Sequence, residues 1–241
     1  MIQLYQLDDT PHFPPIKYAL DDPNGLLAFG GDLSVERLVQ AYQSGIFPWF
    51  NVGEPILWWS PDPRAILLCD EFHCSNSLRK LMRKETYTVT LNTAFAQVIE
   101  QCANIPRRHD VDTRDMSVQT WITSDMIAAY IRLHHAGYAH SVEVWEDGKL
   151  VGGLYGVGIG SSFAGESMFH RKPNTSKLAL AALTQHLKSN GIDFIDCQIH
   201  NPHLASLGAR CVPRHEFLAM LKEASALSPS VSLWQSQRIS Y

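Results

Sequence analysis

Three extended segments in succession, followed by a helix and a further strand, are the feature that most constrains how this chain can fold. The first two, His140–Trp145 and Leu150–Gly156, flank an Asp147-Gly148 pair, a standard two-residue signal for a hairpin. Glycines at positions 158 and 160 predict a second turn, into an extended segment over Ser161–Phe169. The series is completed by a helix, a strand and a last helix, expected over Lys177–Asn190, Phe194–Ile199 and Pro213 to about Ala226.

This order of elements, β-β-β-α-β-α, is typical of an α+β acyltransferase-like layout, in which the last strand splays from its neighbour and opens a cleft. Residues 1–60 are dense in proline, glycine and aromatic residues, whereas regular helices and strands are expected from residue 65 onward. We therefore expect a small mixed domain over residues 1–62 and a larger domain over 63–241, with a mixed, mainly antiparallel sheet flanked by helices. The polar stretch 105–119 and the serine-rich tail 228–241 are expected to be a flexible loop and a loosely attached end.

The strand that begins at Phe194 carries two polar residues in an otherwise core-like segment. Side chains alternate between the faces of a strand, so Asp196 and Gln198 share one face with Phe194, and Ile195 and Cys197 share the other. An unpartnered polar group costs roughly 2–7 kcal/mol to bury, so each needs a partner if that face is buried. The alternatives are a solvated face and a functional one.

A second carboxylate lies on the third extended segment. If that strand is regular, Glu166 shares a face with Ala164 and Met168, while Phe163 and Gly165 face the other way. A glycine beside a glutamate in a central strand favours a bulge or the close approach of a ligand. The alternative is a glutamate exposed to solvent.

Two further segments are candidates for binding. Ser77 is expected to cap a helix over residues 78–84, with one apolar face and one basic face made by Arg79, Lys80, Arg83 and Lys84. The basic face could hold phosphates or simply be solvated. In the aromatic N-terminal part, Trp58 and Trp59 favour a core, whereas Trp49, between Pro48 and Phe50, favours the lining of a cleft.

Composition excludes several classes of protein. The chain is 45% hydrophobic and 18% charged, which predicts a globular core, and its net charge of -4 argues against non-specific coating of nucleic acid. No apolar run approaches 18 residues and the N-terminus lacks the pattern of a signal peptide. Five scattered cysteines, with no Cys-x-x-Cys pair, and dispersed histidines indicate neither a disulfide framework nor a metal site, and fit a reducing cytoplasm.

A phosphate-binding loop for coenzyme A is not expected either. Residues 170–176, which precede the predicted helix at the position where such a loop would lie, contain no glycine. The glycines at 156, 158 and 160 lie between two strands and do not open a helix.

Taken together, eight stretches resemble the leucyl/phenylalanyl-tRNA–protein transferases of bacteria, and the resemblance runs from about Phe13 to Leu221. It is carried by residues 24–33, 45–50, 57–64, 120–123, 140–145, 165–169, 195–198 and 205–209, which read NGLLAFGGDL, GIFPWF, LWWSPDPR, TWIT, HSVEVW, GESMF, IDCQ and ASLGA. The resemblance implies a GNAT-like catalytic domain that uses no coenzyme A or other cofactor. It implies a cytoplasmic enzyme that moves leucine or phenylalanine, with methionine as a further candidate, from aminoacyl-tRNA to an N-terminal Arg or Lys of an acceptor protein, and so marks the acceptor for N-end rule degradation.

The resemblance also implies site residues. Trp49 and Trp121 match positions near the 3′ adenosine of the tRNA, and the basic helix matches the contact with the acceptor stem. Leu154, Phe163, Met168 and Leu183 match the pocket for the amino-acid side chain, where relatives often have Met and Phe in place of the two leucines. Asp196, Gln198 and Glu166 match the catalytic group. An amide is a poor proton acceptor, so we expect Gln198 to position the amine, Asp196 to orient Gln198, and Glu166 to balance charge or contact the acceptor.

Two other classes fit less well, an N-acyltransferase that uses a thioester donor and a catalytically silent tRNA-binding module. The absence of a glycine-rich phosphate loop argues against the first, and the presence of Asp196, Gln198 and Glu166 argues against the second. We expect no membrane partner and a monomeric protein.

Overall fold

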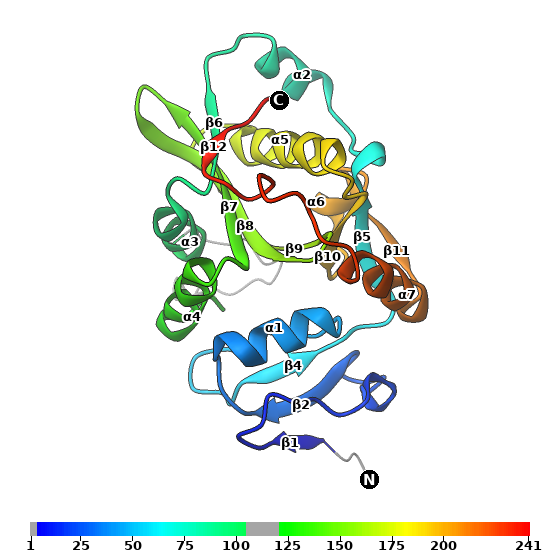
Figure 1. Cartoon of the computed structure of the whole chain (residues 1–241). Helices are drawn as coiled ribbons and strands as arrows, with labels where there is room; N and C mark the ends of the chain where they lie inside the picture. Colours follow the sequence, from blue (N-terminus) through cyan, green and yellow to red (C-terminus); the bar gives the residue numbers. More distant parts are fainter. Residues whose placement is uncertain (1–3, 105–120) are drawn as a thin grey trace, which may run out of the picture.

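A computed structural model describes residues 4–104 and 121–241 and contains two sheets. The smaller sheet has the strand order β1-β2-β4-β3, and its strands are β1 (Tyr5–Leu7), β2 (Leu26–Gly30), β3 (Phe47–Pro48) and β4 (Leu57–Trp59). The helix α1 (Val35–Gln43) connects β2 to β3; Ser34 caps its start and Gly45, with φ of 72°, follows its end. This helix lies between the smaller sheet and the rest of the molecule (Figure 1).

The larger sheet has eight strands in the order β11-β5-β10-β9-β8-β7-β6-β12. They are β5 (Arg64–Leu68), β6 (Thr88–Leu91), β7 (Ala139–Glu146), β8 (Lys149–Ile159), β9 (Ser162–His170), β10 (Phe194–Gln198), β11 (Arg210–Val212) and β12 (Gln237–Arg238). Every pair in it is antiparallel except β9 with β10, which run parallel. The expected α+β class, with a mixed, mainly antiparallel sheet flanked by helices, is confirmed.

Helices cover both faces of the larger sheet (Figure 1). The remaining helices are α2 (Asn76–Met82), α3 (Phe95–Asn104), α4 (Ser124–His135), α5 (Thr175–Ser189), α6 (Pro202–Ala205) and α7 (Arg214–Ser225), with short 3-10 turns at Ile16–Tyr18 and Cys69–Glu71. We call the side covered by α5 the α5 face. The opposite side, covered by α1, α3 and α4 over one half and by α7 over the other, is the α4 face; the core residues divide accordingly.

Two details differ from the sequence-based expectations. The cap of α2 is Ser75, whose side chain accepts a hydrogen bond from the Leu78 N–H, rather than Ser77. The tail is not loosely attached: Leu233 is fully buried, β12 pairs with β6, and the Tyr241 hydroxyl donates to the Tyr87 carbonyl at 2.9 Å. The tail carries few apolar residues, but four of them, Leu233, Trp234, Ile239 and Tyr241, pack into or against the core of the α5 face.

The loop expected at 105–119 lies outside the described residues. None of the helices in the two described ranges combines the length and the apolar character needed to cross a membrane.

Candidate active site

The parallel pair β9–β10 separates after a very short ladder. Only Phe163 with Ile195 and Ala164 with Asp196 are in register. Two residues beyond the ladder on each strand, Glu166 and Gln198 face each other, and the Gln198 Nε2 donates to Glu166 Oε1 at 2.6 Å. The splay expected from the order of the elements is present, and a carboxylate and an amide bridge it.

Glu166 lies at a bulge in β9. The register between β8 and β9 shifts there, because Tyr155 pairs with Ser167 but the next residue, Gly156, pairs with Gly165. The bulge reverses the alternation of side chains along the strand. The expectation that Met168 shares a face with Ala164 is therefore wrong: Ala164 packs into the core of the α4 face and Met168 against that of the α5 face.

Three donors surround the Glu166 carboxylate. The Tyr42 hydroxyl from α1 donates to Oε1 at 2.7 Å, the Tyr130 hydroxyl from α4 donates to Oε2 at 3.1 Å, and the Gln198 amide is the third. The two tyrosine hydroxyls also contact each other. Desolvation raises the pKa of Glu166 to about 7, although the three hydrogen bonds act in the opposite direction. Burial likewise raises the pKa of both tyrosines, which keeps them as hydrogen-bond donors.

Gln198 has an unusual backbone conformation. Its φ of 62° is in the left-handed region, and the pairing of β10 with β5 shifts register between Asp196 and Gln198. The Gln198 N–H donates to Asp196 Oδ1 at 2.9 Å. Asp196 thus contacts Gln198 through its backbone N–H, while Glu166 contacts its side chain.

Asp196 is part of a buried ion pair, which argues against a solvated strand face. Arg64 donates from Nε to Asp196 Oδ1 at 2.8 Å and from Nη2 to Oδ2 at 2.7 Å. The two side chains are only 1% and 7% exposed. The remaining Nη1 of Arg64 donates to the Gly45 carbonyl at 3.1 Å, and the rings of Phe47 and Phe217 lie 4.9 and 4.6 Å from the guanidinium carbon. The ion pair thus ties β10 to the segment that follows α1.

The residues expected to hold the amino-acid side chain come together on the α5 face. Leu154, Phe163 and Leu183 are buried and Met168 packs against the same core cluster. Leu154 and Met168 are paired neighbours on β8 and β9, while Leu183 comes from α5. These four residues, the apolar cluster, lie across the sheet from the tyrosines that contact Glu166.

The two tryptophans expected near the adenosine are not part of the apolar cluster. Trp49 is 40% exposed, and its ring lies 5.6 Å from that of Trp59, whose Nε1 donates to the Trp49 carbonyl at 2.7 Å. Trp121 is partly buried against the core of the α4 face. Trp58 is fully buried and Trp59 packs against the same core, as their core assignment predicts.

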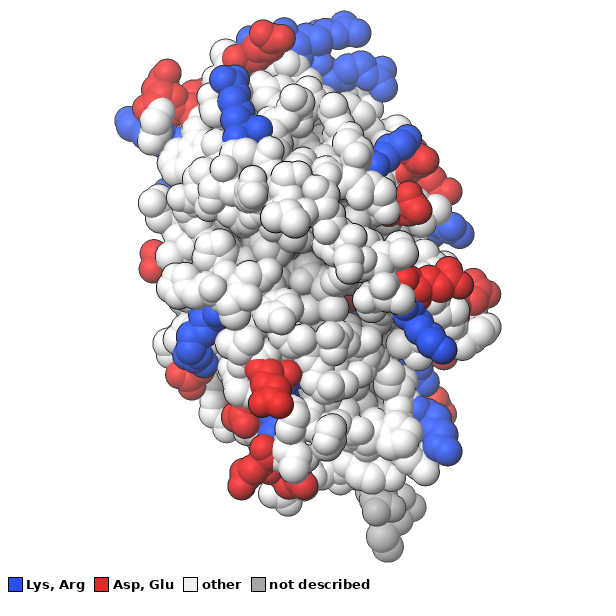
Figure 2. Space-filling model, viewed as in Figure 1, with Lys and Arg blue, Asp and Glu red and all other residues white. Residues whose placement is uncertain are grey.

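The four basic residues predicted on one helix lie apart from both groups. The helix α2 ends at Met82 and not at residue 84, so Arg79 and Lys80 lie on it while Arg83 and Lys84 follow its end. All four are exposed, while Leu78 of the same helix is buried. Figure 2 shows lysine and arginine side chains gathered at the end of the molecule where Figure 1 places α2. The amphipathic pattern is confirmed, and the cationic side chains are free to meet an anion.

Three residues of the site were not singled out as site residues by the sequence analysis. Tyr42 and Tyr130 carry no local signal, since each is one aromatic residue on the buried side of an amphipathic helix. Arg64 closes the motif Trp58-Trp-Ser-Pro-Asp-Pro-Arg64, and an arginine directly before a buried apolar run was a usable sign of a buried ion pair.

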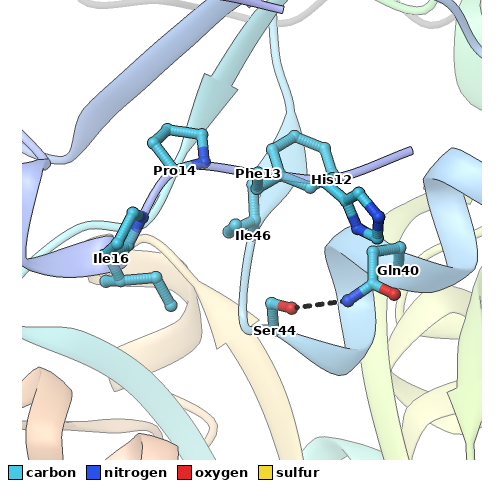
Figure 3. A pocket seen from close by; sticks show the side chains of 8 residues that line it. His12, Phe13, Pro14, Ile16, Gln40, Ser44 and Ile46 are labelled. Carbon is cyan, nitrogen blue, oxygen red and sulfur yellow. Dashed lines mark hydrogen bonds between the residues drawn. The ribbon is translucent and has the colours of Figure 1, made fainter. Parts of the chain in front are cut away.

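A separate hollow lies in the N-terminal part. It has a volume of about 400 Å³ and is lined by His12, Phe13, Pro14, Pro15, Ile16, Gln40, Ser44 and Ile46 (Figure 3). None of the expected site residues lines it. Among the residues that the structure describes, no group of three or more His, Cys, Asp and Glu side chains could hold a metal ion.

A three-stranded meander, a helix and a strand that splays from β9, with polar groups gathered at the splay, form the α+β arrangement that the sequence predicts for an acyltransferase-like domain. A family model described as leucyl/phenylalanyl-tRNA protein transferase matches residues 66–222, and the model of that family's N-terminal domain matches residues 31–62. The chain belongs to the leucyl/phenylalanyl-tRNA protein transferase family.

Individual relatives agree with this assignment over nearly the whole chain. The chain is 58% identical to a leucyl/phenylalanyl-tRNA–protein transferase of Pseudoalteromonas atlantica over 97% of each chain. It is 54% identical to that of Pseudoalteromonas translucida over 98% of this chain and 97% of the relative. Among solved structures, L-PGS from Bacillus licheniformis matches with a TM-score of 0.34 and 13% identity over 73% of this chain and 53% of that chain.

Proposed function

We propose that the protein transfers leucine or phenylalanine, with methionine as a further candidate, from aminoacyl-tRNA to the α-amine of an N-terminal Arg or Lys of an acceptor protein. The observation that carries this proposal is the hydrogen-bonded group of Glu166, Gln198 and Asp196 at the splay of β9 and β10. Membership of the family supports the choice of donor and of a protein acceptor. The modified acceptor would be directed to N-end rule degradation in the cytoplasm, and we propose that the protein acts as a monomer.

The reaction asks little of the protein beyond alignment. The amine nitrogen forms a bond to the ester carbonyl carbon, the bond to the ribose oxygen breaks, and the proton lost by the amine balances the one gained by the ribose hydroxyl. Alignment of two reactants can lower a barrier by about 7–11 kcal/mol. An N-terminal α-amine has a pKa of roughly 7.7–8.0, so a useful fraction of it is neutral near neutral pH.

Gln198 positions the amine in this proposal. Its amide nitrogen is engaged by Glu166, so its carbonyl oxygen is the group that it offers to an N–H of the incoming amine. Asp196 acts through the backbone of Gln198, because it accepts the Gln198 N–H while Arg64 holds both of its oxygens. Glu166, with its pKa near 7, balances the positive charge of the amine or of the basic acceptor side chain.

In this proposal, three other groups of residues bind the remaining parts of the aminoacyl-tRNA. The apolar cluster receives the leucine or phenylalanine side chain, Trp49 and Trp121 contact the terminal adenosine, and the basic residues on and just after α2 contact phosphates of the acceptor stem. We also propose that residues 1–62 and 63–241 are separate domains. The two sheets support this division, since the first ends at Trp59 and the second begins at Arg64.

The test is transfer of labelled leucine from leucyl-tRNA to a peptide that begins with Arg. Label should appear in that peptide, and a peptide identical except for an N-terminal Ala should receive almost none. Equal labelling of both peptides would contradict acceptor recognition, and labelling of neither would overturn the proposed function.

A further inference from the structure

The C-terminal segment places an indole ring directly behind the apolar cluster. The ring of Trp234 is stacked on that of His140, with centroids 4.0 Å apart and planes 3° from parallel. On another side it meets the ring of Phe163, one of the four residues of the apolar cluster, at 5.4 Å. Phe163 is 1% exposed, so its ring is held between the cluster and Trp234.

Two glycines of β8 make the floor on which these rings lie. A Cβ at Gly156 would come within 2.2 Å of the Ala164 carbonyl oxygen and 2.5 Å of the Phe163 ring, and a Cβ at Gly158 within 3.0 Å of the Trp234 ring. Contacts under 3.0 Å are not tolerated, and one at 3.0 Å requires the neighbour to move. The Trp234 ring therefore accounts for Gly158, and the Phe163 ring contributes at Gly156. Any shift of the Trp234 ring changes the space behind Phe163.

The backbone that carries the indole is held by hydrogen bonds from two other parts of the chain. The Asn92 Nδ2 donates to the Trp234 carbonyl at 2.7 Å and lies 3.0 Å from His140 Nδ1, while a ring nitrogen of His186 lies 2.8 Å from the Leu233 carbonyl. Leu233 is fully buried. Hydrogen bonds thus hold the backbone that carries Trp234, and its ring is partly buried against the core of the α5 face.

We propose that Trp234 is a positioning residue that sets the depth of the side-chain pocket by limiting how far Phe163 can withdraw. This inference rests on the proposed function, in which the apolar cluster receives the side chain of leucine or phenylalanine. With the indole in place, the pocket favours the shorter leucine. Without it, the Phe163 ring can move over Gly158 and admit a longer side chain.

The experiment measures kcat/KM for transfer from leucyl-tRNA and from phenylalanyl-tRNA to the same Arg peptide, with the same enzyme preparation. In Trp234→Ala the phenylalanine-to-leucine ratio should rise about tenfold, the lower end of the discrimination that small size differences give in apolar pockets. Trp234→Phe, which keeps a smaller ring, should raise it by less. Any loss of folded protein affects both substrates equally and cancels in the ratio.

Tyr241→Phe is the matched control, because it removes the hydrogen bond to the Tyr87 carbonyl from the same segment but leaves Trp234 in place. Its ratio should equal that of the wild type. If both Trp234 variants kept the wild-type ratio, or if Tyr241→Phe changed it as much, the inference would be overturned. A wild-type protein that transfers neither amino acid would instead refute the proposed function.

Discussion

The two faces of the larger sheet differ in character: one carries a hydrogen-bonded polar group and the other an apolar cluster, although their residues are near neighbours on the same strands. On the α4 face, Tyr42 and Tyr130 meet the carboxylate of Glu166. On the α5 face, two residues further along β9, Met168 joins an apolar cluster. The bulge at Glu166 makes this possible, because its extra residue breaks the alternation and places residues 166 and 168 on opposite faces. Under the proposed function, chemistry and side-chain selection can thus be changed separately by mutation.

Each face also contains a desolvated titratable group, and loss of water shifts the two pKa values in opposite directions. Desolvation raises the pKa of Glu166 to about 7 and lowers that of His140, which is stacked on Trp234, to about 3. The rule is the same in both cases, since loss of water disfavours the charged form of an acid and of a base alike. Near pH 6 both groups are therefore mainly neutral.

The largest effect is expected on the α4 face, from loss of the buried ion pair. Asp196→Ala leaves the Arg64 guanidinium buried without its carboxylate, and breaking such a pair costs about 3–5 kcal/mol. The free energy of unfolding, measured by urea denaturation, should fall by that amount. The single-turnover rate of transfer should fall as well, because Gln198 loses the acceptor of its backbone N–H.

Glu71→Ala is the matched control for the ion pair. The Arg210–Glu71 pair is about half exposed on both sides, so its loss should cost about 0–1 kcal/mol. Equal losses in the two variants, or normal single-turnover rates in Asp196→Ala with saturating substrates, would show that Asp196 does not support the site.

An intermediate effect is expected from Glu166→Gln, measured as stability against pH. The folded protein keeps the proton of Glu166 up to about pH 7, whereas an unfolded chain releases it near the ordinary value of 4.5. The folded state then binds more protons between those values, so this group lowers stability as pH rises from 4.5 to 7, by at most about 1.4 kcal/mol per pH unit. Glutamine does not titrate and removes this contribution.

The stability of the wild type relative to Glu166→Gln should therefore decline across that pH range. His140 contributes the opposite slope between about pH 3 and 6.5, but it is present in both proteins and cancels in the difference. Parallel profiles of stability against pH for the two proteins would mean that the pKa of Glu166 is not raised in the folded state.

The smallest effect on either face of the sheet is expected from the basic residues at the end of α2. They lie apart from the polar residues around Glu166 and from the apolar cluster. Replacing Arg83 and Lys84 by alanine should weaken binding of aminoacyl-tRNA and reduce the slope of log affinity against log salt by about one unit per lost phosphate contact. The phenylalanine-to-leucine ratio should not change. Lys222→Ala, an exposed lysine on α7, serves as the control, and an unchanged tRNA affinity in the α2 variant would exclude this contact.

The order of the elements could be predicted from the sequence because the hairpin turn at Asp147-Gly148 and the helix-stop glycines are local signals. The residues that meet at the splay could be singled out as well, because Asp196, Gln198 and Glu166 are polar residues in apolar strands. The hydrogen bonds that connect these residues could not be predicted. A bulge at Glu166 and a left-handed backbone at Gln198 arise from the fit of several strands, and strict alternation cannot reveal either.

The C-terminal tail shows a different limit of sequence reasoning. Its serine-rich composition is typical of a loose end, yet Leu233, Trp234, Ile239 and Tyr241 pack into or against the core and dock it. The gap for Trp234 is made by Gly158, which lies 76 positions earlier in the chain. Only the tertiary structure brings the ring and the glycine together.

The contacts that build the site join very distant parts of the chain. Tyr42 and Glu166 are 124 positions apart, and Arg64 and Asp196 are 132 apart. Closing such long loops costs conformational entropy, and this cost arises before the contact can stabilise the fold. During refolding the hairpin β7–β8 can form early, whereas the site becomes complete only when both ends of the fold have met. Recovery of transfer activity should therefore report the last stage of folding, after most of the secondary structure has returned.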